Sequence, residues 1–188
     1  SISFWFKEPT SIVAGTKHDI ILKGTFGPPT DSGNGKRFEF MRQRLSVSED
    51  YVRWIVSDGI TTSSLSIVAG LVCTGDWVHV VCIRDKDANQ LRIYVNGVLR
   101  SAVYDGSGNV TNDKPLYMGQ DQMIGGIDDV RIYSGALSLD QVTAIYLGQW
   151  NVDTSSPTPS PMSFSVSPAA VTADSITMTA AIARDQSG

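Results

Sequence analysis

The segment GGIDDVRIY, residues 125–133, places two carboxylates and a guanidinium in an otherwise apolar run. Paired carboxylates can transfer protons, bind a metal ion or anchor a structure through ion pairs. Alternate side chains of a strand point to opposite faces, which places Asp129 with Arg131 on one face and Asp128 with Val130 on the other. On this pattern the two aspartates can neither share one proton nor flank one glycosidic bond, so catalysis by this pair is not expected.

Structural roles and a metal-binding role remain for these aspartates. Asp129 and Arg131 are expected to join ion pairs and hydrogen bonds with neighbouring strands. Asp128 shares an apolar face, where an uncompensated charge is costly, so it requires a partner. Backbone N–H groups of the Gly125-Gly126 turn are one such partner. A calcium ion, which takes several oxygen ligands, is the other, and Asp128 is then its predicted ligand.

The composition excludes several classes of protein. Of the 188 residues, 41% are hydrophobic and 18% are charged, which indicates a globular protein rather than a disordered one. The formal net charge is −4 and no basic run exceeds two residues, which argues against a nucleic-acid partner. No apolar run is long enough to span a bilayer, so membrane insertion is not expected. The chain opens inside a strand-like pattern, with no initiator Met and no signal peptide at its start. We interpret it as part of a longer protein.

The two cysteines, Cys73 and Cys82, lie nine positions apart. This spacing suits neither a disulfide framework nor a tetrahedral metal site, which would need further ligands. We interpret both as small buried apolar side chains, and a disulfide between them is the alternative.

Alternation with a period of two, broken by turn signals, predicts strands through residue 134. Asn96-Gly97 supplies the two positive-φ positions of a type I′ turn and indicates a three-strand meander over residues 77–104. The fold class is therefore all-β, a two-sheet antiparallel β-sandwich. The predicted strands are 2–6, 19–23, 38–47, 51–57, 64–68, 77–84, 91–95, 98–104, 115–119 and 126–133.

The pattern changes after residue 134. Ser138 and Gln141 form a capping box, and Gly148 is a plausible stop, which together predict one short C-terminal helix and a domain over residues 1–148. Residues 149–161 are rich in Pro, Ser and Thr and predict a linker. Residues 162–188 predict a β-hairpin, too small to fold alone, which resembles the truncated opening of an immunoglobulin-like or fibronectin type III module.

Five segments in this order resemble the laminin G-like jelly roll of the concanavalin A-like lectin/glucanase superfamily: SISFWFK, GDWVHVV, LRIYVNG, PLYMGQ and GGIDDVRIYSGALSLDQVTAIYLG. The resemblance covers residues 1–148. It implies two packed antiparallel sheets, one of them concave, and calcium at a rim in many members. It also implies a non-catalytic module of a larger secreted or cell-surface protein that binds a carbohydrate or another extracellular protein.

Members of this family usually have a further strand before the SISFWFK position, beside the strand at 127–133. The sequence given starts after it, so an open sheet edge is expected there. A homodimer, or docking of the C-terminal tail, would cover that edge.

The sequence argues against an enzyme. Glucanases of the superfamily carry E-x-D-x-E or E-x-D-x-x-E on one strand, and this chain has neither pattern. Its three glutamates are Glu8, Glu39 and Glu49, far apart in sequence. His79 matches the W-x-H-V strand of the family and is interpreted as structural. A glycoside hydrolase is therefore the least favoured function, behind a structural spacer or adhesion domain with no small ligand.

The predicted ligand-binding residues are aromatic rings and loop polar groups. Flat rings can stack on sugar faces, while Asp and Asn fix sugar hydroxyls. Cross-strand packing is the alternative role for Trp54 and Tyr94, and Trp5 and Trp77 are interpreted as core residues. The candidates are Tyr51, Trp54 and Tyr94, together with Asp31 and Asn34 of the loop at 24–37.

Overall fold

A computed structural model describes residues 1–24, 35–120 and 123–149, and the backbone of 164–172 and 175–180. These residues form two compact units, Ser1–Gly148 and Gln149–Gly188. In the second unit, β11 (Phe164–Thr172) and β12 (Ser175–Ala180) pair antiparallel. The assignment of this hairpin to an immunoglobulin-like or fibronectin III module stays a prediction. The linker predicted at 149–161 lies, apart from residue 149, outside the described residues.

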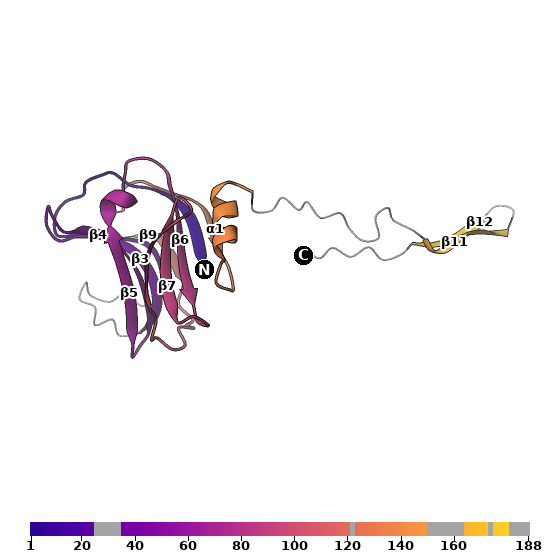
Figure 1. Ribbon diagram of the computed structural model, residues 1–188, viewed down its shortest axis with the longest axis horizontal. Coiled ribbons are helices and arrows are strands. Elements are labelled where there is room, and N and C mark those ends of the chain that lie inside the picture. Colours follow the sequence, from indigo (N-terminus) through magenta and orange to yellow (C-terminus); the bar gives the residue numbers. More distant parts are fainter. Residues whose placement is uncertain (25–34, 121–122, 150–163, 173–174, 181–188) are drawn as a thin grey trace. The chain divides into compact units, whose positions relative to one another are not determined.

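The first unit consists of two five-stranded antiparallel sheets that pack face to face (Figure 1). Sheet A has the order β10-β1-β6-β7-β8 and sheet B the order β5-β4-β3-β2-β9. The predicted β-sandwich is therefore confirmed. Sheet A contains β1 (Ile2–Lys7), β6 (Val78–Asp85), β7 (Gln90–Val95), β8 (Val98–Tyr104) and β10 (Gly126–Ile132). Sheet B contains β2 (Thr16–Gly24), β3 (Lys36–Arg44), β4 (Asp50–Asp58), β5 (Thr62–Val68) and β9 (Leu116–Gln120). A short 3-10 turn, Ala69–Leu71, follows β5.

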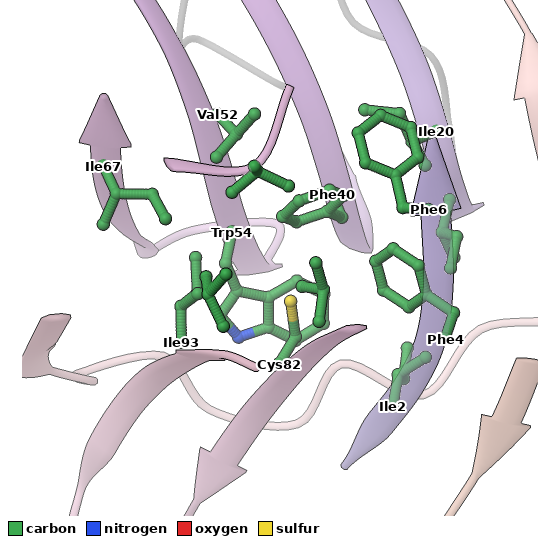
Figure 2. Packing of buried hydrophobic residues seen from close by; sticks show 14 of the residues in the cluster. Ile2, Phe4, Phe6, Ile20, Phe40, Val52, Trp54, Ile67, Cys82 and Ile93 are labelled. Atoms are coloured by element: carbon green, nitrogen blue, oxygen red, sulfur yellow. The ribbon is translucent and has the colours of Figure 1, made fainter. Parts of the chain in front are cut away.

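The core lies between the two sheets and is built from the alternate residues that face inward. Phe4 and Phe6 of β1 face Phe40 of β3 (Figure 2), with ring centroids 5.2 Å apart for Phe4 and Phe40 in an edge-to-face arrangement. Such aromatic pairs add about 0.5–1.5 kcal/mol beyond the burial of their area. Cys82 belongs to this core, and both Cys73 and Cys82 are free and buried, as the apolar interpretation predicts.

Local sequence signals set the ends of several elements. Asn96 and Gly97 have φ values of 50° and 77°, which the turn between β7 and β8 requires. The helix α1 (Leu139–Tyr146) begins with the predicted capping box, and Gly148 beyond its end has a φ of 70°. The Tyr146 ring of α1 stacks on His79, so this helix packs on the outer face of sheet A (Figure 1).

The strand β10 forms an edge of sheet A, where the open edge was expected. Dimerisation or tail docking at this edge stays a prediction.

Candidate functional site

The outer face of sheet B carries a cluster of charged and polar side chains. Phe40, Val52 and Trp54 face the core, so the residues that alternate with them on β3 and β4 face outward. We define the charged face as Lys17, Asp19, Arg37, Glu39, Gln43, Tyr51 and Arg53, from β2, β3 and β4.

Two carboxylates on this face converge on one ammonium group. Lys17 Nζ lies 2.7 Å from Asp19 Oδ1 and 2.6 Å from Glu39 Oε1. Arg37 Nε lies 3.2 Å from Glu39 Oε2. Asp19 is 1% exposed and Glu39 is 3% exposed. Apart from these ion pairs, Asp19 Oδ1 and Oδ2, Glu39 Oε1 and Arg37 Nε have no hydrogen-bond partner among the described residues. The ion pairs hold these buried groups in place.

Burial of the Asp19 carboxyl raises its pKa to about 7, and the neighbouring Glu39 adds to this effect against the opposing pull of Lys17. Burial alone would lower the pKa of Lys17, but Glu39 and Asp19 outweigh it and raise that pKa above its ordinary value. Lys17 therefore stays charged near neutral pH, while the Asp19 carboxyl is partly protonated there.

We expect Asp19→Asn to become more stable relative to the native protein as pH rises from 5 to 8. The pKa of Asp19 is about 7 in the folded state and about 3.9 in the unfolded state, so the native protein loses stability as pH rises through this window, by an amount on the order of 2–4 kcal/mol. The asparagine amide keeps the donor without titrating. Thermal melts at pH 5 and pH 8 measure the effect, with the exposed Asp76→Asn as control. A melting difference that does not change with pH would contradict the shifted pKa.

Tyr51 is the predicted ligand residue that the structure places on the charged face. The guanidinium carbon of Arg53 lies 4.8 Å from the centroid of its ring. The Tyr51 hydroxyl donates to Gln43 Oε1 over 3.3 Å. Asp31 and Asn34 lie outside the described residues, in the segment that joins β2 to β3.

Trp54 and Tyr94 are buried and do not present a ring face at the surface. Trp54 is 3% exposed and lies in the core near Ile93 and Cys82 (Figure 2). Tyr94 is 4% exposed on sheet A, opposite Val81 on the neighbouring strand. The ligand-stacking role predicted for these two rings is therefore wrong, and the alternative role, cross-strand packing, applies. The strand β4 turns Trp54 toward the core, and Tyr94 lies beside Val81 with almost none of its surface accessible.

The strand β10 does not keep the simple alternation that the sequence predicts. Ser3 pairs with Arg131, whereas Trp5 pairs with Asp128, so β10 contains a β-bulge. Asp129 lies in this bulge with a φ of 46°. Asp128 and Arg131 therefore both face the outside of sheet A. The prediction that Asp128 shares an apolar face is wrong, because the extra residue turns this exposed carboxylate outward.

The calcium prediction stays open. Asp128 Oδ1 accepts the backbone N–H of Asp129 over 2.8 Å, and Asp129 Oδ1 accepts from Arg131 Nε over 2.8 Å. Within the described ranges, no three His, Cys, Asp or Glu side chains are grouped so as to hold an ion.

A second charged cluster lies inside the sandwich. The Glu8 carboxylate contacts His18 Nδ1, Arg42 Nη1 at 3.1 Å and Cys73 Sγ at 3.5 Å. Arg42 also binds Asp50, with 2.6 Å between Nη2 and Oδ2. Burial raises the pKa of the Cys73 thiol, so it stays protonated and is not a nucleophile. This cluster anchors the segment after β1 rather than forming a catalytic Cys–His pair.

Sequence reasoning missed the acid pair of Asp19 and Glu39. A signal was present, because Lys17 and Asp19 are two positions apart in the sequence, as are Arg37 and Glu39, but the strands predicted at 19–23 and 38–47 leave out Lys17 and Arg37. Charges at this spacing share one face of a strand.

Comparison with known proteins defines the class. The family model described as concanavalin A-like lectin/glucanases superfamily, in its laminin G form, matches residues 1–143. The chain belongs to this family. No curated protein matches it significantly.

Three similar solved structures are binding domains of botulinum neurotoxins. The binding domain of serotype D has a TM-score of 0.59 at 20% identity, over 79% of this chain and 36% of that chain. The serotype D ligand-binding domain in complex with N-acetylneuraminic acid has a TM-score of 0.59 at 22% identity, over 79% and 36%. The binding domain of neurotoxin DC in complex with SialylT has a TM-score of 0.57 at 12% identity, over 79% and 35%. The chain thus spans about a third of the length of these domains, and at this identity the likeness establishes the fold. Among the described residues, no helix has the length and apolar character to span a bilayer.

Proposed function

We propose that residues 1–148 form a non-catalytic glycan-binding module that holds its ligand on the charged face of sheet B. The observation that carries this proposal is a set of half-buried polar groups held in fixed positions: Lys17 by the buried acid pair Asp19 and Glu39, and Tyr51 by Gln43 and Arg53. Fixed donors and acceptors of this kind suit the hydroxyl groups of a sugar. The membership in a superfamily that includes lectins, and the sialic-acid complex of a similar toxin domain, support the same ligand class.

The arrangement favours binding over hydrolysis. A glycosidase holds its two carboxyl groups roughly 5–9.5 Å apart on either side of the bond to be cleaved. Here both carboxylates contact the ammonium of Lys17, which lies between them. The acid pair therefore supports an anchoring role, and a spacer without ligand remains the different-class alternative.

The half-buried Tyr51 supplies the aromatic surface of the proposed site. Its ring packs on the Arg53 guanidinium, and its hydroxyl is fixed by Gln43, so the ring is held in one orientation. A pre-oriented ring loses little conformational entropy when a sugar stacks on it. We include Asp31 and Asn34 in the site, because the segment that carries them connects β2 and β3. Secretion or surface display, and a calcium requirement, belong to the same proposal.

A glycan array with the whole chain tests this function, once with calcium and once with chelator. We expect binding to at least one glycan class, and loss of binding on chelation only if calcium belongs to the site. Tyr51→Ala should weaken that binding roughly fivefold or more, since truncating a central aromatic contact typically costs above about 1 kcal/mol. Tyr104→Ala is the matched control, because this tyrosine is 75% exposed on β8 of the other sheet.

The outcomes separate the alternatives. No binding in either condition would reject the glycan-binding function and favour the spacer. Binding that Tyr51→Ala leaves unchanged, with native melting of the variant, would move the ligand away from the charged face.

A further inference from the structure

We propose a second saccharide-binding site on the outer face of sheet A, formed by the indole of Trp77 with Asp128 and Arg131. It lies on the opposite side of the sandwich from the charged face and goes beyond the proposed site there.

Trp77 is an aromatic ring held at the surface. The sequence predicts a core residue here, but Trp77 is 46% exposed and lies directly before β6. Its ring lies on Gly126 of β10: a Cβ added to this glycine would come within 2.7 Å of Trp77 Cη2. Gly126 pairs with Lys7 of β1, the strand between β6 and β10. The ring therefore reaches across β1, and only glycine at position 126 lets it lie there.

The bulge in β10 brings polar groups to the same face. Asp129 is one of three non-glycine residues with positive φ in the described part of the chain, and the other two, Asn89 and Asn96, lie in turns between strands. Bulges of this kind redirect side chains. Here the result is that Asp128 faces outward beside Trp5 instead of facing the core.

The spacing fits one sugar ring. Gly126 and Asp128 are two residues apart on one face of a strand, which corresponds to roughly 7 Å. A pyranose stacked on Trp77 above Gly126 would thus place a hydroxyl within reach of the Asp128 carboxylate. Arg131 lies farther along the same face, and its Nε is bound by Asp129.

The charges point to a neutral saccharide. Arg131 offsets the charge of Asp129, so the carboxylate of Asp128 remains to accept hydrogen bonds from ligand hydroxyls. Lys7, which pairs with Gly126 and is exposed on the same face, offsets the charge of Asp128, so the face has no net charge that would favour an anionic ligand. Next to this face, His79 is 1% exposed and its Nδ1 has no hydrogen-bond partner among the described residues. The His79 ring packs against Trp5, whose partner on β10 is Asp128.

Fluorine NMR of the whole chain labelled with 5-fluorotryptophan tests this site. The chain has four tryptophans, and the spectrum of Trp77→Phe assigns the resonance of Trp77. Neutral manno-, gluco- and galacto-oligosaccharides are the probes. We expect at least one of them to shift the Trp77 resonance while the resonance of the core residue Trp54 stays in place.

Variants then measure the contribution of each group. Trp77→Ala should weaken the binding of that oligosaccharide roughly tenfold, and Asp128→Asn should weaken it several-fold. Gly126→Ala keeps both chemical groups but displaces the ring, so it should also weaken binding. Tyr104→Ala should leave binding unchanged, and thermal melts show whether each variant folds.

A shift in other resonances with none for Trp77, together with binding that depends on Tyr51 alone, would overturn this second site and leave the charged face in place. A Trp77 shift that Tyr51→Ala does not alter would support the second site even if the charged face binds nothing. Absence of any shift with every probe would overturn the second site.

Discussion

Arg42→Met is expected to lower the free energy of unfolding by about 3–5 kcal/mol, since removing one partner of a buried ion pair leaves the other charge uncompensated. The Arg42 side chain is fully buried, with an exposed fraction of 0%. It donates to Glu8, to Asp50 and to the carbonyl oxygens of Pro9 and Thr10. Methionine fills much of the same volume but makes none of these bonds, so the buried Glu8 loses its guanidinium.

Urea unfolding at pH 7 measures this loss, with an unchanged m-value showing that the transition is still two-state. The matched control is Arg44→Met on the same strand. Arg44 is half-buried and donates to Ser11 Oγ, Ile12 O and Ser46 O, all of them uncharged acceptors. We expect the control to cost within about 1 kcal/mol. Equal losses for the two variants would show that the charge of Glu8 is not what Arg42 compensates.

A second variant tests the same explanation. In the double variant Glu8→Gln with Arg42→Met, the buried charge is removed together with its partner. The two single losses should therefore not add up. A fully additive result would show that Glu8 and Arg42 act independently.

Asp105→Asn is expected to lower the free energy of unfolding at pH 7 by about 3 kcal/mol, because Arg84 then loses its buried counter-charge. Asp105 is 0% exposed and accepts from Arg84 Nε over 2.8 Å and from the Ser107 N–H over 2.9 Å. Burial alone would raise the pKa of Asp105, but the bonds from Ser107 and Arg84 outweigh it and lower the pKa to about 2.

The lowered pKa of Asp105 determines how the stability of the native protein changes with pH. The folded-state pKa lies below the unfolded value of about 3.9, so this carboxylate stabilises the fold above that pH and loses its effect as pH falls toward 2. The difference in stability between the native protein and Asp105→Asn should therefore shrink by about 2–3 kcal/mol between pH 7 and pH 2. Asp113→Asn is the control, because this side chain is 90% exposed and its contact with Lys114 Nζ is long, at 3.7 Å. A gap that stays constant in acid would contradict the lowered pKa.

Much of the sandwich could be predicted because its signals are local. Alternation located all ten strands of the first unit, and the capping box at Ser138 located α1. Asn96-Gly97 defined its turn through the conformations those two residues tolerate. None of these inferences needed knowledge of a distant partner.

The positions of Asp128 and Trp77 depend on such partners. The bulge in β10 appears only in its pairing with β1, where one extra residue shifts the register. Without that pairing, alternation assigns Asp128 to the wrong face. The sequence pattern around Trp77 predicts a core residue. Its ring instead lies on the outer face, where Gly126 of β10, two strands away, leaves room for it.

The position of the acid pair, Asp19 and Glu39, also depends on how distant strands pair. The spacing of Lys17 and Asp19 predicts a shared face, but not that Glu39 of β3 lies beside them. That contact depends on the register between β2 and β3, which shifts between Asp19 and Ile21. A single sequence gives no measure of that shift.

The two thiols have a practical consequence for experiments on this domain. Cys73 and Cys82 are the only cysteines of the chain, and burial raises the pKa of each. A maleimide reacts with an accessible thiolate, so neither native side chain competes for the reagent while the domain is folded. A cysteine introduced at the exposed position 113 would therefore accept a fluorophore or spin label selectively, with the native sulfurs left in place.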